Sequence, residues 1–211
     1  MNRKASRTLV AWGLATAFGL AAFALAHAAP LSGPALVAAL RQGGYVILMR
    51  HASSPFTPPE AGAADPQNVH LERQLDERGR STARAMGAAL KRLRIPVGEV
   101  LSSPTYRALE TIRLAGLPAA QTFDELGDRG QSMQAAAGSQ ADWLRARVAQ
   151  PPRGGTDTII VTHYPNIAGA FGRQASGLTD GEAMIFHPER QGAELVGRIK
   201  IEDWPTLAKQ P

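Results

Sequence analysis

The chain has 211 residues and a mass of 22.4 kDa, with 44% apolar and 19% charged residues, which suits one globular domain and excludes a disordered chain. It has no cysteine, so disulfides, thiol catalysis and thiolate metal sites are excluded. The formal net charge is +5, but three of the basic residues lie within the first seven positions. Without them 20 basic side chains stand against 18 acidic ones, which gives no reason to expect a nucleic-acid partner.

The first 28 residues have the pattern of a secretory signal peptide. A basic start precedes an uncharged run over residues 8–26, and Ala26-His27-Ala28 places small residues where signal peptidase reads them. The alternative is an uncleaved membrane anchor, because the run approaches the length that spans a bilayer. Its many alanines and the exit site favour cleavage. We therefore expect a single mature domain at residues 29–211, periplasmic or secreted, with no membrane insertion after cleavage.

The first half of this domain alternates between helix and strand patterns. Ser32 and Pro34 are typical of a helix start, and this helix is predicted to end at Gln42. The apolar run Tyr45–Met49 predicts a strand buried on both faces. Residues 52–74 hold four prolines and no periodicity, which is typical of a functional loop. The next predicted elements are a helix capped by Asp76, a strand at Val97–Ser102, a helix from Pro104 and a short strand at Ala119–Phe123.

The second half continues the alternation. A helix is predicted over residues 132–149, a buried strand at Asp157–Thr162 and a short helix at Asn166–Gly172. Ala183–His187 and Leu195–Ile201 read as two strands that pair antiparallel across the turn at residues 188–192. The whole pattern predicts the α/β class: one three-layer α/β/α domain around a mainly parallel central sheet.

Cationic and imidazole side chains follow three of the predicted strands. Arg50 and His51 end the first, Arg107 comes shortly after the second, and His163 ends the strand at Asp157–Thr162. Ligands of such sheets bind beyond the carboxyl ends of the strands, where these groups would converge. Their own short segments offer no carboxylate partner, and guanidinium groups match phosphate oxygens with paired hydrogen bonds. The inferred ligand is a phosphoryl group.

The same segments resemble the motifs of a known family, the histidine phosphatase superfamily, in the branch that contains phosphoglycerate mutases and bacterial phosphohistidine phosphatases. LMRHASS at 48–54 resembles the Arg-His signature, and LDERGRSTARAMGAAL at 75–90 the second conserved stretch. SSPTYRALETIRLA at 102–115, VTHYPNIAGAFG at 161–172 and EAMIFHP at 182–188 resemble the remaining segments. The resemblance runs from about residue 44 to residue 201, with the motifs in the family's order, and implies a phosphoglycerate mutase-like fold.

The resemblance also implies roles for individual residues. His51 is the nucleophile that becomes phosphorylated, Arg50 and Arg107 hold the phosphoryl oxygens, His163 adds a hydrogen bond or charge, and Ser54 helps to cradle the phosphate. No metal and no other cofactor is implied. A metal site built on the two histidines lacks the usual ligand spacing, since the sequence has no His-x-His or His-x-x-Glu-His pattern.

Among the departures from the family's pattern, two concern residues expected to act at the site. No Asn follows His51 within a few residues, and Asn68 is the alternative that would have to fold back from the loop. The general-acid glutamate also has no clear equivalent. Asp124, Glu125 and Asp128 are its candidates, and we assign the role to Glu125 because it follows a strand that ends near the site; surface positions for all three remain the alternative.

The sequence thus predicts an enzyme, a histidine-type phosphatase. We expect a secreted phosphomonoesterase that works through a phosphohistidine on His51 and acts on a phosphorylated small molecule or cell-envelope substrate. Mutase activity is disfavoured because an exported enzyme would lack a bisphosphate primer. The alternative is a catalytically weak family member that binds a phosphorylated envelope ligand, and the unassigned acid keeps this alternative open.

Overall fold

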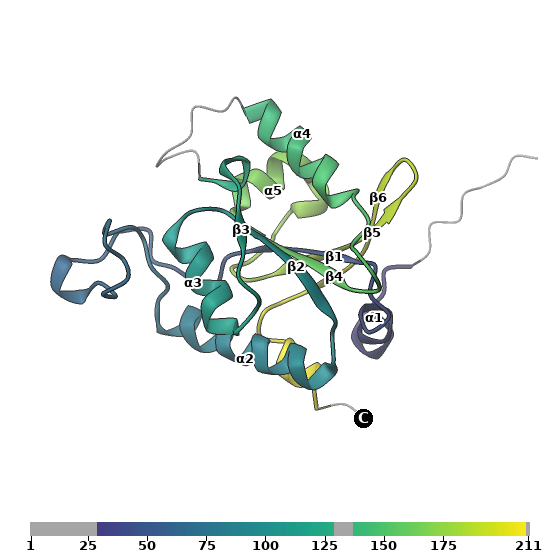
Figure 1. Ribbon diagram of the computed structural model, residues 1–211, viewed down its shortest axis with the longest axis horizontal. Coiled ribbons are helices and arrows are strands. Elements are labelled where there is room, and N and C mark those ends of the chain that lie inside the picture. Colours follow the sequence, from purple (N-terminus) through teal and green to yellow (C-terminus); the bar gives the residue numbers. More distant parts are fainter. Residues whose placement is uncertain (1–28, 129–136, 210–211) are drawn as a thin grey trace, which may run out of the picture.

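The computed structural model describes residues 29–128 and 137–209 and has a six-stranded sheet at its centre (Figure 1). The strands lie in the order β3-β2-β4-β1-β5-β6. β1 to β4 run parallel, whereas β5 is antiparallel to β1 and β6 to β5. This confirms a mainly parallel sheet with an antiparallel hairpin at one edge. The strands are β1 (Val46–Arg50), β2 (Val97–Ser102), β3 (Gln121–Thr122), β4 (Asp157–Thr162), β5 (Ala183–Glu189) and β6 (Gly192–Ile199).

Helices cover both faces of the sheet, and Figure 1 shows α4 and α5 on one face and α1 and α2 on the other. Alternate residues of β1 enter two separate apolar clusters: Ile47 and Met49 pack with α1, α2 and α3, while Val46 and Leu48 pack with α4 and α5. This alternation confirms the three-layer α/β/α architecture. The helices are α1 (Gly33–Leu40), α2 (Glu77–Leu93), α3 (Tyr106–Ala115), α4 (Ala137–Val148), α5 (Tyr164–Phe171) and α6 (Trp204–Leu207), with short 3₁₀ turns η1 (Ala61–Ala63), η2 (Asp124–Leu126) and η3 (Gly172–Ala175).

Several predicted boundaries shift in the structure. Asp76 caps α2 as expected, accepting a 2.7 Å hydrogen bond from the Gly79 amide, whereas Ser32 stands at the start of α1 without a capping bond. The predicted strand at Ala119–Phe123 shrinks to two residues. The hairpin turn is also shorter than predicted, because Pro188 and Glu189 still pair with β6.

Three further differences concern helices. α3 and α5 each begin two residues away from their predicted starts, and α6 has no counterpart in the sequence prediction. The predicted helix at 132–149 is described only from Ala137 onward, since 132–136 lie outside the described residues, as do residues 1–28 with the predicted signal peptide. Within the described ranges, no helix is both long and apolar enough to cross a membrane.

The first turn of α2 lies directly against the segment that follows β1. A Cβ atom on Gly79 would come within 2.1 Å of the Ser53 carbonyl oxygen, so only glycine permits this approach. The Asp76 carboxylate also accepts a 2.7 Å hydrogen bond from the Ser53 hydroxyl. The stretch at 75–90 therefore fixes the chain immediately after His51.

Candidate active site

The site is built where β1, β2 and β4 end. Backbone hydrogen bonds join their exits: the His51 amide donates to the Thr162 carbonyl at 3.0 Å, and the Ser103 amide donates to the Val161 carbonyl at 2.9 Å. These bonds hold the three exit segments side by side. This arrangement brings four residues to one edge of the sheet, as the sequence predicts: Arg50, His51, Arg107 and His163.

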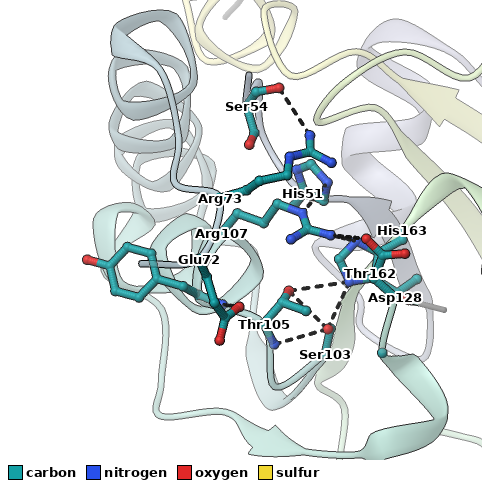
Figure 2. Close-up of polar contacts among 12 residues, drawn as sticks. His51, Ser54, Glu72, Arg73, Ser103, Thr105, Arg107, Asp128, Thr162 and His163 are labelled. Carbon is teal, nitrogen blue, oxygen red and sulfur yellow. Dashed lines mark hydrogen bonds and ion pairs between the residues drawn. The ribbon is translucent and has the colours of Figure 1, made fainter. Parts of the chain in front are cut away.

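Arg107 connects the two histidines. It lies in the first turn of α3 and is fully buried, with its Nε 3.2 Å from His51 Nε2 and its Nη2 3.1 Å from His163 Nδ1 (Figure 2). α3 is fixed in turn by Thr111, whose hydroxyl accepts a 3.1 Å hydrogen bond from the Ala52 amide and donates to the Arg107 carbonyl. The guanidinium is therefore held rigidly between the two imidazole rings.

The hydrogen bonds of His51 assign its tautomer. Its Nδ1 lies 2.7 Å from the Ala52 carbonyl oxygen, which can only accept, so Nδ1 carries the proton and Nε2 carries the lone pair. The pKa of His51 lies well below its usual value, first because the ring is buried, then because of its electrostatic coupling to the His163 ring, and also because Arg107 and Arg50 place positive charge nearby. His51 is therefore neutral, as a nucleophile must be.

His163 is held in the complementary tautomer. A guanidinium can only donate, so its contact with Nδ1 leaves the ring proton on Nε2. That nitrogen lies 2.9 Å from the Ser103 hydroxyl and 3.3 Å from the Thr105 hydroxyl. Burial lowers the pKa of His163 to about 3, with further contributions from Arg107, Arg73 and Arg50. Both imidazoles are thus uncharged beside the arginines.

Two carboxylates reach the arginines from distant segments. Asp128 Oδ2 lies 2.5 Å from Arg107 Nη2, and Asp180 Oδ1 lies 2.6 Å from Arg50 Nη2. The sequence argument found no carboxylate because it considered only the short segments around the strand ends. Both partners come from outside these segments.

Hydrogen bonds from the end of β4 and from α5 place Asp128. The Thr162 hydroxyl donates to the Leu126 carbonyl and the Asn166 amide group donates to the Gly127 carbonyl, each at 2.8 Å. Both donors are buried. The residues around the second histidine therefore position the chain that carries Asp128.

Two guanidinium nitrogens at the site have no hydrogen-bond partner among the described residues. They are Arg50 Nε and Arg107 Nη1, and both atoms are buried. A buried donor without an acceptor costs on the order of 1–3 kcal/mol, more when it belongs to a charged group. Donors left open on two neighbouring guanidinium groups fit an anion with several oxygens, such as a phosphoryl group.

The side chains of three other residues selected from the sequence form no hydrogen bond with Arg50, His51, Arg107 or His163. The Ser54 hydroxyl donates to the Gln74 carbonyl at 2.9 Å, within the loop at 52–74. Asn68 is buried and its amide group bonds to the backbone of Glu72 on both sides. The Glu125 side chain forms no hydrogen bond or ion pair with the described residues of the site, whereas Asp128 contacts Arg107 directly.

The structure adds Arg73, which the sequence analysis did not select. Its charge is one of the main causes that lower the pKa values of Arg107 and His163, which places it close to both. Arg73 sits in an aperiodic loop, and its only sequence signal is its position two residues before the stretch that begins at Leu75.

Among the described residues, no group of three or more His, Asp or Glu side chains is arranged to hold a metal ion.

Comparison with known proteins identifies a family. Residues 46–154, just over half of the chain, match the model of the histidine phosphatase superfamily, branch 1. A comparison with curated protein sequences gives no significant match.

Several solved structures are similar in fold. A protein histidine phosphatase, SixA, complexed with tungstate superposes with a TM-score of 0.55 at 20% identity, over 75% of this chain and 98% of that one. A mutant phosphoserine phosphatase from Entamoeba histolytica in complex with phosphoserine gives 0.52 at 14%, over 75% and 98%. A putative alpha-ribazole-5'-P phosphatase from Escherichia coli gives 0.50 at 17%, over 72% and 94%.

Fold and site together define an α/β protein with two arginines and two neutral histidines at the carboxyl edge of its sheet. The chain belongs to the histidine phosphatase superfamily, branch 1. Its enzyme class is accordingly that of the histidine-type phosphatases, which are phosphoric monoester hydrolases.

Proposed function

We propose that the protein hydrolyses a phosphate monoester through a phosphohistidine formed on Nε2 of His51. The observation that carries this proposal is the neutral His51 next to two guanidinium groups with open, buried N–H donors. Burial and cationic neighbours keep the imidazole unprotonated, and the same cations attract the phosphoryl group to it.

The first chemical step transfers the phosphoryl group to the enzyme. The phosphoryl oxygens take the N–H groups of Arg107 and Arg50, which frees the His51 lone pair from its contact with Arg107 Nε. Nε2 then forms a bond to phosphorus while the ester P–O bond breaks, and the leaving oxygen takes a proton. The Nδ1 proton bonded to the Ala52 carbonyl keeps the ring in the reactive tautomer as positive charge develops on it.

The second step returns the enzyme to its initial state. A water oxygen attacks the phosphorus and gives a proton to the carboxylate that served as proton donor in the first step, the P–N bond breaks, and inorganic phosphate leaves with His51 neutral again. The guanidinium groups stabilise the charge on the equatorial oxygens in both steps. His163 presents a neutral ring and is oriented by Ser103, so it serves as a hydrogen-bonding group near the phosphoryl rather than as a second charge.

Two carboxyl groups are candidates for the proton donor in the first step. The sequence assignment to Glu125 stays a prediction, but the contact of Asp128 with Arg107 favours Asp128. A bound phosphate dianion beside a carboxyl group favours its protonated form, which can then serve the leaving oxygen.

The second candidate function is a weak or silent member that binds a phosphorylated cell-envelope ligand. It is supported by the Asp128 carboxylate, which already accepts a hydrogen bond from Nη2 of Arg107. Hydrolysis of an aryl phosphate in the presence of EDTA distinguishes the two functions, because an aryl leaving group needs little protonation. Turnover that EDTA leaves unchanged supports the phosphatase. Phosphate binding without turnover of either aryl or alkyl phosphates supports the binding protein.

We also propose that the chain is exported and cleaved close to Ala28, so that the domain at 29–211 acts in the periplasm or outside the cell on small or envelope-linked phosphomonoesters. The basis is the charged, apolar and A-x-A order of the first 28 residues. Mass spectrometry of the protein recovered from the periplasmic fraction tests this. A membrane-bound chain that still begins at Met1 contradicts it.

A further inference from the structure

Arg73 is held by the loop at 52–74 against the site. Its Nε donates to the Pro55 carbonyl at 2.6 Å and its Nη2 to the Ser54 carbonyl at 3.3 Å. Figure 2 draws the side chain together with His51 and Arg107, with its guanidinium bonded to Ser54. Because Ser54 is three residues after His51, the contact ties this guanidinium to the segment that carries the nucleophile.

The charge of Arg73 has no direct carboxylate partner among the described residues. Arg50 is paired with Asp180 and Arg107 with Asp128, but Arg73 bonds only to neutral carbonyl oxygens. Partial burial lowers the pKa of Arg73, the charge of Asp128 opposes this, and Arg50 and Asp180 have smaller effects that lower and raise the pKa respectively. A third guanidinium near two others, without its own counter-ion, is an arrangement that an anion stabilises.

A side chain with no role in the core lies against Arg73. The Phe56 ring is 87% exposed, and the guanidinium carbon of Arg73 lies 5.3 Å from its centroid. Stacking on an aromatic face attracts the guanidinium to the ring and restricts its orientation. The exposed position of Phe56 therefore has its explanation in Arg73 rather than in the core.

We propose that Arg73 binds the phosphoryl group of the substrate as a third arginine, and that Phe56 is the positioning residue that orients it. This inference rests on the proposed function. Arg50 and Arg107 approach from the sheet and from α3, while Arg73 comes from the loop and addresses an oxygen that the other two leave open. Three guanidinium groups favour a dianionic monoester over a monoanionic diester or sulfate ester, so Arg73 also selects the substrate class.

The experiment uses the mature protein and measures binding of inorganic phosphate by calorimetry, together with kcat and KM for phenyl phosphate. The variants are Arg73→Gln, Arg73→Lys and Phe56→Leu. Arg92→Gln is the matched control, because Arg92 is an exposed residue in the last turn of α2 and carries the same charge change. Thermal unfolding of every variant establishes that it folds.

Arg73→Gln is expected to weaken phosphate binding on the order of 10- to 100-fold and to raise KM by a similar factor, the usual effect of removing a charge-assisted hydrogen bond. Arg73→Lys should recover part of the loss, since charge returns without the planar fork. Phe56→Leu should weaken phosphate binding by about 2- to 5-fold, the range of one exposed cation–π contact. Arg92→Gln should bind phosphate like the wild type.

Unchanged phosphate affinity in a folded Arg73→Gln variant overturns the inference while leaving the proposed function intact. Equal losses in Arg73→Gln and Arg92→Gln overturn it as well, because the effect is then one of net charge. A wild-type protein that neither binds phosphate nor hydrolyses phenyl phosphate contradicts the proposed function itself. The two failures are therefore distinguishable.

Discussion

The rings of His51 and His163 lie 5.2 Å apart, centroid to centroid, at an interplanar angle of 63°. Both are buried, and Arg107 donates a hydrogen bond to each. Two imidazoles at this distance from each other and from a guanidinium are stable only when both are neutral, and the lowered pKa values of both residues express this. The lowered pKa values that keep His51 unprotonated, as a nucleophile must be, therefore also make the free energy of unfolding depend on pH.

The first prediction concerns this link. Between pH 6.5 and 3 the unfolded chain binds a proton at His163 that the folded protein does not, so the free energy of unfolding decreases as the pH falls. For His163 alone the loss between pH 6.5 and pH 5 is about 2 kcal/mol. Asp157 acts in the opposite direction, because burial raises its pKa to about 7.

Comparison with a variant separates these two contributions. Urea unfolding of the wild type and of His163→Asn is measured at pH 6.5 and pH 5. Asp157 is the same in both proteins, so the difference between their pH dependences belongs to His163 and to its effect on the pKa of His51. The variant should lose less stability on acidification than the wild type. Identical slopes would show that His163 is not held neutral in the folded protein.

The second prediction concerns the nucleophile. His51→Asn should abolish turnover, because it removes the Nε2 lone pair that is proposed to attack the phosphorus beside the open donors of Arg50 and Arg107. Asparagine keeps a hydrogen-bonding group of similar size, so the fold should persist. Rapid quenching of the wild type with labelled substrate should give a protein phosphate that is stable in alkali and lost in acid. A phosphate on another residue, or full activity of the variant, refutes the assignment.

The third prediction concerns the contact between α2 and the segment after His51. Gly79→Ala should reduce stability by about 1–3 kcal/mol, the usual cost of overpacking, although alanine is otherwise the better helix former. It should also reduce kcat, because Ser53 and its neighbours must move. Gly62→Ala is the control, since its Cβ would meet no atom within 4 Å. If the two variants are equally stable and active, the close approach has no functional importance.

The sheet and the central four residues could be predicted because their signals are local. β1 and β4 are apolar runs that end directly on Arg50-His51 and on His163, and parallel strands bring such ends together. β3 was predicted too long because only Gln121 and Thr122 pair with β2. α6 was missed because it is a single turn held by the buried Trp204, and one turn has no periodicity to detect.

The acidic and loop-borne parts of the site could not be predicted in the same way. Asp128 reaches Arg107 through hydrogen bonds that Thr162 and Asn166 make to a segment more than 30 residues earlier in the chain. Arg73 is placed by carbonyl groups of its own loop, which has no pattern that indicates its path. Contacts between distant backbone groups leave no trace in local composition, so the positions of Asp128 and Arg73 could be found only from the structure.

The last prediction concerns the general acid, for which sequence and structure favour different residues. An alkyl phosphate has a poor leaving group that needs a proton, while an aryl phosphate does not. Removing the true acid should therefore slow alkyl phosphate hydrolysis far more than aryl phosphate hydrolysis, on the order of 10²- to 10⁴-fold for the alkyl substrate. The variants are Asp128→Asn and Glu125→Gln, each assayed with phenyl phosphate and glycerol phosphate.

The contact with Arg107 makes Asp128→Asn the variant expected to show this selective loss, because its carboxyl group lies 2.5 Å from a nitrogen that is proposed to bind the phosphoryl. Glu125 forms no hydrogen bond with the described site, so Glu125→Gln should behave like the wild type on both substrates. A selective loss in Glu125→Gln alone would return the role to the residue that the sequence favoured. Equal losses on both substrates in Asp128→Asn would mean that Asp128 only positions Arg107, and protonation of the leaving oxygen would then fall to water.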